Sequence, residues 1–360
     1  MKEYIILVLN PGSTSTKIAI YKNTEELISK NLHHPAKELS RYDSIQAQLG
    51  YRYGIIRQFM EEAGYPPDRL DCIISRGGAP PFAKAGATVI DENFLDALVN
   101  HPLEQHPAGL GPVIADELAR EGGIPAYIYD PVTANELLPQ ARLGGIKDME
   151  RDSMCHILNG HAQGIAVARE LGRKFEEMNL IVAHFGGGNS VCAWVKGHPV
   201  DVVPGDACSF SAERCGLIRG EKLLDMVKEE GVDKVRTYFH GKGGIVSWLG
   251  TNDLRSVEEE IQRENEQAVL IEQAMAYQLS KSIISLMPAA DGAFDGIILT
   301  GGGANWRRLT DDVSAHLTFL QLPIYIRPGE KELSALAGGA YRVMTGAETA
   351  HRYGPYPKKE

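Results

Sequence analysis

The sequence predicts an α/β protein built from two similar domains. Short apolar runs that end in polar or glycine-rich residues alternate along the chain with longer patterns of helical periodicity. One arrangement, an apolar strand, a glycine-containing turn and a returning strand, occurs at residues 4–21 and again at 180–195. The chain has 360 residues, which is more than one hydrophobic core usually holds, so we expect two domains of roughly 150 to 200 residues each. The recurrence also suggests that a cleft lies between the two domains.

The first half begins with a buried strand at residues 5–9, which Asn10-Pro11-Gly12 interrupts before a returning strand at 17–21. Short buried strands are expected at 72–75 and 126–130, with a helix around 109–120 between them. Each of these strands ends on a polar or charged group.

In the second half, a helix is expected to begin at Asp152 or Ser153, which are favourable N-cap residues. A long helix around 267–287 should stop at Pro288, and a strand at 296–300 should lead into a triple glycine. A last strand at 324–326 and a helix from about 333 to 344 complete the pattern. In such sheets, ligands bind at the carboxyl ends of the strands.

Composition and charge argue against several classes of protein. Hydrophobic residues make up 43% of the chain and charged residues 23%, as in ordinary folded proteins. The net charge is −10 and no long Lys/Arg run occurs, so we expect no nucleic-acid partner. The first apolar run is too short to span a bilayer and carries no signal-peptide pattern, so we expect no membrane partner. The five scattered cysteines form no C-x-x-C pair, which favours reduced thiols in a cytoplasmic enzyme.

Three glycine-rich segments could approach phosphates, namely residues 10–17, 183–190 and 299–305. The alternative for the first is a hairpin turn whose Ser and Thr side chains bind their own backbone, and for the second a glycine hairpin with a structural His184. Neither a dinucleotide-binding G-x-G-x-x-G nor a Walker A lysine motif occurs, which weakens the dehydrogenase and P-loop interpretations.

Two arginines could bind a carboxylate or phosphate, because the guanidinium offers a planar fork of donors. Arg76 directly follows the strand at 72–75, and Arg214 lies in the segment Ser211-Ala212-Glu213-Arg214. Asp130 ends a strand and His106 precedes Pro107; helix or turn capping would explain either of them.

Together, and in the same order from end to end, these segments resemble the acetate and butyrate kinase family, within the sugar kinase and actin superfamily. The matching segments are residues 10–17, 74–78, 106–111, 129–132, 179–190, 213–216, 250–255 and 300–305. The form of residues 10–12, 75–78 and 328–333 is more similar to the butyrate kinase branch. The chain departs from the family pattern at 79–82, at Ala212 and at Cys215, near the expected acyl pocket.

The resemblance implies two similar domains of the ribonuclease H-like/actin-like ATPase type with a nucleotide cleft between them, covering residues 1–150 and 151–360. It leaves open whether the last helix packs back on the N-terminal domain. The implied activity is reversible Mg²⁺-ATP-dependent phosphorylation of a short-chain fatty acid, butyrate or a branched acid of similar size, to its acyl phosphate. The implied assembly is a homodimer or a multiple of it.

The resemblance also implies site residues. Arg76 would bind the substrate carboxylate with His106 nearby, Arg214 and His184 would contact the transferring phosphoryl group, and Asp130 would lie close to the reacting groups. The residues expected to bind ATP are Asn10, Ser13, Ser15, Lys17, Gly186, Gly187, Gly188, Asn189, Asp253, Leu254, Arg255, Gly301, Gly302, Gly303 and Asn305. Asn10 and either Glu330 or Glu332 would be linked to Mg²⁺.

Three alternatives remain at this point. A kinase of the same superfamily acting on an alcohol or sugar would need a base, for which Asp130 is the candidate. An actin-like ATPase could couple its nucleotide state to assembly rather than to metabolism. A silent member of the family is the third, against which the presence of Arg76, His184 and Arg214 argues.

Overall fold

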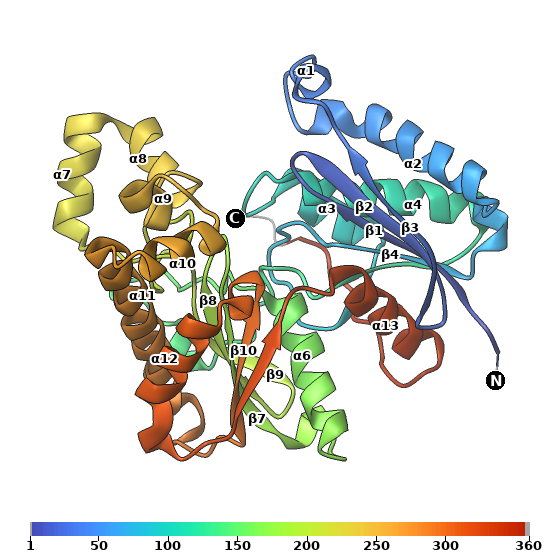
Figure 1. The fold of residues 1–360 in the computed structure, drawn as a ribbon. Coiled ribbons are helices and arrows are strands. Elements are labelled where there is room, and N and C mark those ends of the chain that lie inside the picture. Colours follow the sequence, from blue (N-terminus) through green and yellow to red (C-terminus); the bar gives the residue numbers. More distant parts are fainter. Residues whose placement is uncertain (1, 357–360) are drawn as a thin grey trace. The chain divides into compact units, whose positions relative to one another are not determined.

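Each of the two units into which the chain divides is built around one mixed β-sheet (Figure 1). The computed structural model describes residues 2–356. Unit 1 comprises the chain up to Asn135 together with the segment from Lys331 onward, and unit 2 comprises Glu136–Glu330.

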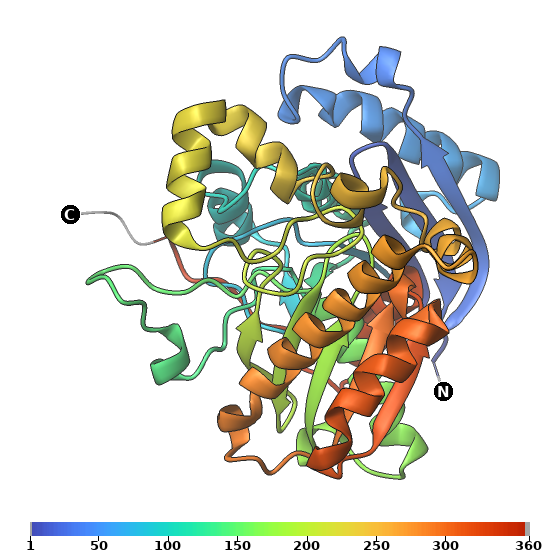
Figure 2. The same ribbon diagram turned by 60° about the vertical axis from the view of Figure 1, so that its left-hand side comes forward.

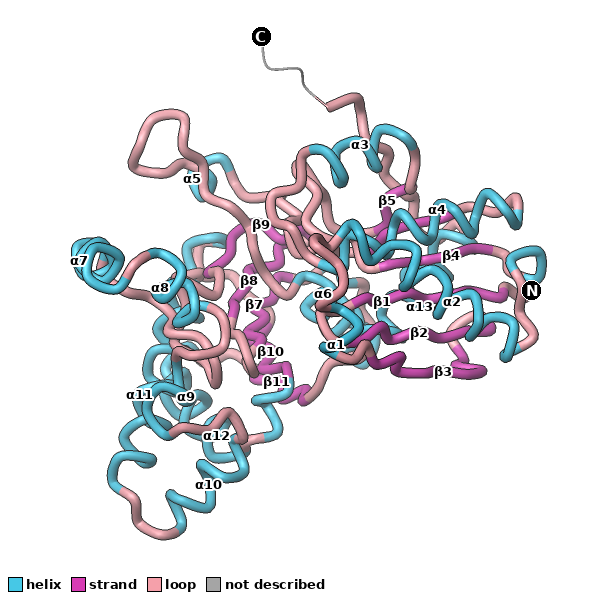
Figure 3. The backbone as a smooth tube through the Cα atoms, turned by 90° about the horizontal axis from the view of Figure 1, so that it is seen from above, coloured by secondary structure: helices cyan, strands magenta, loops and turns pink. Residues whose placement is uncertain are grey.

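The sheet of unit 1 has the strand order β3-β2-β1-β4-β6-β5. An antiparallel meander forms one side, and two strands continue it in parallel before a short antiparallel edge strand. The strands are β1 (Ile5–Pro11), β2 (Ser15–Lys22), β3 (Glu25–His33), β4 (Cys72–Ser75), β5 (Ala87–Val89) and β6 (Ala126–Tyr129). Helices α2 (Leu49–Ala63) and α4 (Leu110–Gly122) cover one face and α13 (Glu332–Met344) the other (Figure 3). The short α1 (Ala36–Leu39) and α3 (Glu92–Asn100) complete the unit.

The sheet of unit 2 repeats this plan in the order β9-β8-β7-β10-β11. Its strands are β7 (Asn179–His184), β8 (Ser190–Val195), β9 (His198–Val203), β10 (Gly296–Gly301) and β11 (Ile324–Pro328). Figure 2 shows α11 (Glu266–Ser285) and α12 (Arg307–Leu317) side by side on one face, and α6 (Ile157–Glu170) packs on the same sheet through β7 and β10. The remaining helices are α5 (Pro139–Arg142), α7 (Gly220–Glu230), α8 (Val232–Phe239), α9 (Gly244–Leu249) and α10 (Leu254–Gln262).

The shared plan confirms the prediction of two similar α/β domains. In both units a meander leads into a parallel strand pair, so β1 corresponds to β7 and β4 to β10. Helix α13 follows β11 of unit 2 in the sequence yet packs on β1 and β4 of unit 1. The contacts divide the chain after residues 135 and 330; that the folding domains divide at 150/151 stays a prediction.

The central strands read as continuous apolar runs because helices cover both faces of each sheet. Residues 6–11 of β1 and all residues of β4 and β10 are buried. This burial accounts for the absence of a polar/apolar alternation in these strands. Polar side chains are therefore found at the ends of the strands. Within residues 2–356, no helix combines the length and apolar character needed to cross a bilayer.

The predicted start of the helix at Asp152 or Ser153 is wrong, because α6 begins at Ile157. The backbone N–H of His156 instead donates to Ser190 Oγ at 3.3 Å, which holds residues before Ile157 against β8. The long helix ends at Ser285, and Pro288 lies in a following 3₁₀ turn, Met287–Ala290.

Candidate functional site

The first set of predicted residues surrounds one carboxylate in unit 1. Asn10 and Lys17 are directly opposite each other in the β1–β2 pair, so their side chains leave the sheet together. Asn10 Nδ2 donates to Glu332 Oε2 at 2.8 Å, and Lys17 Nζ lies 3.2 Å from the same oxygen. Arg76 Nη1 lies 3.9 Å from Glu332 Oε1. Unit 1 therefore brings an amide and two cations around the carboxylate at the start of α13.

Arg76 is placed by the end of β4, as its position in the sequence predicted. Its backbone N–H donates to Leu9 O at 3.0 Å, which continues the parallel ladder by one residue beyond the strand. Its side chain is 17% exposed, so most of it is packed while part of it remains accessible to solvent. The position suits a donor fork for an anion.

The backbone of the turn that precedes Ser15 is bound by the side chain of Arg52. This arginine is fully buried in α2, and its Nη1 and Nη2 atoms donate to Gly12 O at 2.8 Å and Ser13 O at 3.2 Å. Burial lowers the pKa of its guanidinium. Sequence reasoning missed Arg52, because an arginine in a helical pattern carries no signal that it reaches a distant turn.

Asp130 and His106 have identifiable structural partners in unit 1. Asp130 is fully buried with φ of 45°, and its Oδ1 accepts from Gly86 N–H at 2.7 Å. His106 Nδ1 accepts from Ala108 N–H at 3.1 Å and so caps the 3₁₀ turn Pro107–Gly109. Burial lowers the pKa of the His106 imidazole, and the nearby Arg76 cation lowers it further, so the structure relates His106 to the Arg76 cluster. Asp130 adopts a backbone conformation that is uncommon outside glycine.

In unit 2, His184 ends β7 and is 3% exposed. Its Nε2 lies 3.0 Å from Glu330 Oε1, and its Nδ1 lies 3.0 Å from Asn159 Nδ2. The ring of His156 stacks on it, with centroids 3.8 Å apart and planes 3° apart. Asn159 and His156 were not predicted; they lie at the start of α6, and nothing in the sequence relates them to β7.

Arg214 lies against the glycine turn that follows β7. A Cβ built on Gly188 would be 3.0 Å from Arg214 Cζ, so glycine is what lets the guanidinium pass there. Ser211 fixes the segment: its Oγ donates to Gly187 O at 2.6 Å and accepts from Arg214 N–H at 3.0 Å. Asn189 adds a second anchor, since its Oδ1 accepts from Gly186 N–H at 3.2 Å.

The predicted nucleoside segments also lie in unit 2. Gly301 has φ of 90°, and a Cβ there would be 2.4 Å from Phe185 O, so the turn after β10 requires glycine. Gly303 N–H donates to Phe185 O at 2.8 Å, which joins two of the predicted glycine segments. The rest of this turn holds Gly302 and Asn305, whose Nδ2 donates to Gly302 O at 3.0 Å.

The segment 250–255 is joined to the Arg214 segment by one side-chain bond. Asn252 Nδ2 donates to Glu213 Oε1 at 2.7 Å. Asp253 caps α10 and pairs with Arg255 at 2.9 Å, and the bonds from Arg255 lower the pKa of the Asp253 carboxyl. Leu254, the first residue of α10, is half-buried.

Glu330 and Glu332 have different partners although one residue separates them in the sequence. Glu330 belongs to unit 2 and binds His184, whereas Glu332 belongs to unit 1 and binds Asn10. Among residues 2–356, no group of three or more His, Cys, Asp or Glu side chains could hold a metal. Mg²⁺ sites in phosphoryl-transfer enzymes need only one or two carboxylates beside substrate phosphates and water, and Asn10 with Glu332 supplies oxygen donors of that kind.

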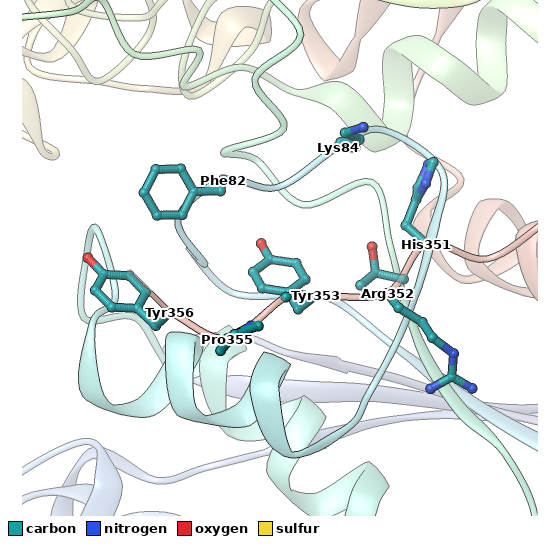
Figure 4. A pocket seen from close by; sticks show the side chains of 9 residues that line it. Phe82, Lys84, His351, Arg352, Tyr353, Pro355 and Tyr356 are labelled. Carbon is teal, nitrogen blue, oxygen red and sulfur yellow. The ribbon is translucent and has the colours of Figure 1, made fainter. Parts of the chain in front are cut away.

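A pocket in unit 1 is lined by none of the predicted residues (Figure 4). Lys84 and His351 lie at one end of it and the aromatic rings of Phe82 and Tyr356 at the other. Tyr353 OH within it donates to Pro81 O at 2.5 Å. The cavity, about 210 Å³ in volume, does not coincide with any of the segments predicted to bind phosphates.

Comparison with known proteins gives a consistent result. The model of the acetokinase family matches residues 163–338. A protein of Listeria innocua named "Probable butyrate kinase" is 37% identical over 355 residues, which is 97% of this chain and 99% of the relative. The crystal structure of Porphyromonas gingivalis acetate kinase superposes with a TM-score of 0.75 at 18% identity, covering 96% of this chain and 100% of that one. A propionate kinase from Francisella tularensis gives 0.70 at 18% identity, covering 94% and 99%.

Proposed function

Because this chain belongs to the acetokinase family, we propose that it transfers the γ-phosphoryl group of Mg²⁺-ATP reversibly to a short-chain carboxylate. The preferred acceptor is butyrate or a branched acid of similar size, since the relatives that match nearly the whole chain are named probable butyrate kinases. We place the reaction in the cytoplasm and expect a homodimer or a multiple of it, which sedimentation of the pure protein would test.

The observation that carries this proposal is the burial of Asp130. An alcohol acceptor must lose its proton during transfer, and Asp130 is the candidate base for that step. Its carboxyl group is fully buried and accepts the N–H of Gly86, so it is poorly placed to receive a proton from a ligand. A carboxylic acid has a pKa of about 4 to 5 and is already ionised at neutral pH, so it needs no base.

The chemical task is then to bring two anions together and to stabilise the charge on the transferring phosphoryl group. In the proposal, Arg76 binds the acceptor carboxylate, because its guanidinium offers a planar fork of donors matched to two carboxylate oxygens. In this structure its nearest carboxylate oxygen among the ion pairs is Glu332 Oε1, 3.9 Å from Nη1. Lys17 forms an ion pair with the Glu332 carboxylate in this structure and would bind phosphate oxygens.

Arg214 and His184 act on the phosphoryl group in this proposal. Both belong to unit 2, and in both a donor group is fixed by neighbouring side chains; Nε2 of His184 is bound to Glu330 here and would exchange this partner for the phosphoryl group. Ser211 Oγ accepts the backbone N–H of Arg214, and Asn159 Nδ2 contacts Nδ1 of His184. A donor held in this way stabilises developing charge without reorganising during the reaction.

Mg²⁺, when bound with ATP, would neutralise charge on the phosphates. We assign Asn10 and Glu332 to it rather than Glu330, because Asn10 and Glu332 lie together in one unit and Glu330 binds His184. Replacing Glu332 by Gln should therefore raise the Mg²⁺ concentration needed for half-maximal activity far more than replacing Glu330 by Gln. The opposite order would reassign the metal to Glu330.

The test is to incubate the pure protein with Mg²⁺-ATP and acetate, propionate, butyrate, isobutyrate or valerate, and to trap acyl phosphate with hydroxylamine. Each misplaced methylene should cost about 1 to 3 kcal/mol, so kcat/KM should peak at the four-carbon acids. Butanol and glucose, assayed by ADP release, serve as alcohol acceptors. ADP release with an alcohol and no hydroxamate with any acid would overturn the proposal.

A further inference from the structure

His184 Nδ1 is part of a buried hydrogen-bond chain that runs between three elements of unit 2. Asn159 of α6 is 7% exposed and Thr300 of β10 is fully buried. Asn159 Nδ2 lies 3.0 Å from His184 Nδ1 and 3.1 Å from Thr300 Oγ1, and Thr300 Oγ1 lies 3.4 Å from Gly329 O. The proposed reaction uses Asn159 to fix the ring, but it leaves open which nitrogen of His184 carries the proton.

The proton positions follow from the end of the chain. Gly329 O is a carbonyl and can only accept, so the single hydroxyl proton of Thr300 points to it. Thr300 Oγ1 must then accept from Asn159, which identifies the neighbouring Asn159 atom as the NH₂ group. That group also faces His184 Nδ1, which must be an unprotonated acceptor. The remaining imidazole proton is on Nε2, directed at Glu330 Oε1 3.0 Å away.

We propose that Asn159 is a positioning residue that holds His184 as a neutral imidazole with its proton on Nε2, so that this nitrogen always presents an N–H donor. The inference rests on the proposed function, because the acceptor of that donor during turnover is an oxygen of the transferring phosphoryl group. In the structure described here, Glu330 accepts the same N–H.

The ring of His156, which stacks on His184, is held by a second hydroxyl group. The backbone N–H of His156 and the thiol of Cys155 both donate to Ser190 Oγ at 3.3 Å, so the Ser190 hydroxyl proton is directed at His156 Nδ1, 2.7 Å away. The stacked ring is therefore fixed from β8, as His184 is fixed from α6.

The other charged or titratable groups near His184 are few among the described contacts. Glu330 approaches its Nε2, and His156 lies over its face. The free thiols of Cys155 and Cys192 form a hydrogen bond with each other, and Cys155 Sγ also lies 3.3 Å from Ser190 Oγ. From β10 only the uncharged Thr300 joins the chain, through Asn159. Asn159 at Nδ1 and the Glu330 carboxylate at Nε2 therefore both favour the proton on Nε2. When Glu330 gives way to the phosphoryl group, Asn159 maintains this preference.

The first test is spectroscopic and independent of catalysis. Two-dimensional ¹⁵N–¹H spectra of histidine-labelled protein distinguish protonated from unprotonated ring nitrogens, and the His184→Gln variant identifies the His184 signals. The wild-type protein at neutral pH should show a protonated Nε2 and an unprotonated Nδ1. A protonated Nδ1 in the wild-type protein would overturn the inference, whatever the variants do.

The second test compares two variants of matched size. Asn159→Leu removes the donor to Nδ1, so the His184 ring loses the bond that fixes its orientation and its preference for a proton on Nε2 once Glu330 gives way to the phosphoryl group. The value of kcat should then fall about 10²-fold, as for loss of one transition-state donor. KM for ATP should change less than kcat. Asn159→Asp accepts a proton from Nδ1 and leaves the N–H on Nε2, so it should recover most of the lost kcat and show both ring nitrogens protonated.

The outcomes separate this inference from the proposed function. Equal kcat values for the wild-type protein and Asn159→Leu would overturn the positioning role. If no acid is phosphorylated by the wild-type protein, the proposed function fails while the wild-type spectrum still decides the proton position. If Asn159→Leu does not fold, the wild-type spectrum and Asn159→Asp remain decisive.

Discussion

Arg214 passes so close to Gly188 that a single methyl group would displace it: the Cβ of an alanine at 188 would lie 3.0 Å from Arg214 Cζ and 3.1 Å from Nε. The neighbouring Gly187 differs, because its nearest neighbour would be Glu213 Oε2 at 3.7 Å, an ordinary contact. The glycine turn therefore positions an arginine in addition to its expected contact with phosphates.

Gly188→Ala should lower kcat by roughly 10² to 10³-fold, because the displaced guanidinium no longer meets the phosphoryl group. Gly54→Ala is the control, because this exposed glycine of α2 lies outside the predicted site and an added Cβ meets nothing within 4 Å; its kcat should stay within a few-fold of the wild-type value. Steady-state kinetics with saturating butyrate measures both. Equal losses of kcat in the two variants would contradict the link between Gly188 and Arg214.

Arg214→Ala should lower kcat by roughly 10³-fold with little change in KM for ATP, since its contacts form in the transition state. Near-normal kcat in Arg214→Ala would show that the role assigned to it is wrong. Arg307→Ala is a suitable control, because that side chain is 91% exposed and pairs only with Asp311 among the ion pairs of the described residues.

Arg76→Ala should instead raise KM for the carboxylate as well as lower kcat.

Asp130→Ala should destabilise the protein by about 1 to 3 kcal/mol, because the buried Gly86 N–H loses its acceptor. The positive φ at this position adds to the cost for alanine, whereas asparagine tolerates it. Asp130→Asn keeps an acceptor oxygen and should lose less. Urea unfolding monitored by fluorescence compares the three proteins, and an equal loss in both variants would argue against the Gly86 bond as the cause.

Glu272 predicts an unusual dependence of stability on pH. Burial, with a further contribution from nearby Asp312, raises the pKa of Glu272 from 4.5 to about 7. Between these two values the folded chain binds the proton more tightly than the unfolded chain, so the free energy of unfolding falls as pH rises from about 4.5 to about 7. Above pH 7 the full cost, about 3 kcal/mol, is present.

Glu272→Gln cannot ionise and should therefore be more stable than the wild-type protein at pH 8, while the two differ little at pH 4.5. Glu259→Gln, at an exposed position of α10, should show no such pH-dependent gain. Thermal unfolding across this range measures the difference. A gain that does not change with pH would mean that packing rather than ionisation separates the proteins.

Much of the fold could be predicted because its signals are local. The repeated strand, turn and strand pattern identified β1–β2 and β7–β8, and apolar runs identified β4 and β10. Local signals failed at the start of α6, where favourable N-cap residues precede the helix by several positions. The bond from His156 N–H to Ser190, far away in the sequence, decides that boundary.

The placement of candidate residues was predictable where they follow from a position at a strand end. Arg76 follows β4 and His184 ends β7, as expected, while the roles assigned to them and to Arg214 stay predictions. Arg52 and Asn159 were not found, because each lies within a helix and reaches a turn or ring on another element. Such supporting residues depend on tertiary packing, which periodicity and motif spacing do not report.

The central claim is that a carboxylate oxygen of the acceptor attacks the γ-phosphorus of ATP. It is tested most directly with butyrate labelled with ¹⁸O in both carboxylate oxygens, incubated with Mg²⁺-ATP and the protein, and followed by ³¹P NMR. The account predicts an acyl phosphate whose phosphorus signal shows the upfield shift of one directly bonded ¹⁸O atom. An unshifted acyl phosphate signal, or inorganic phosphate as the only product, would contradict it.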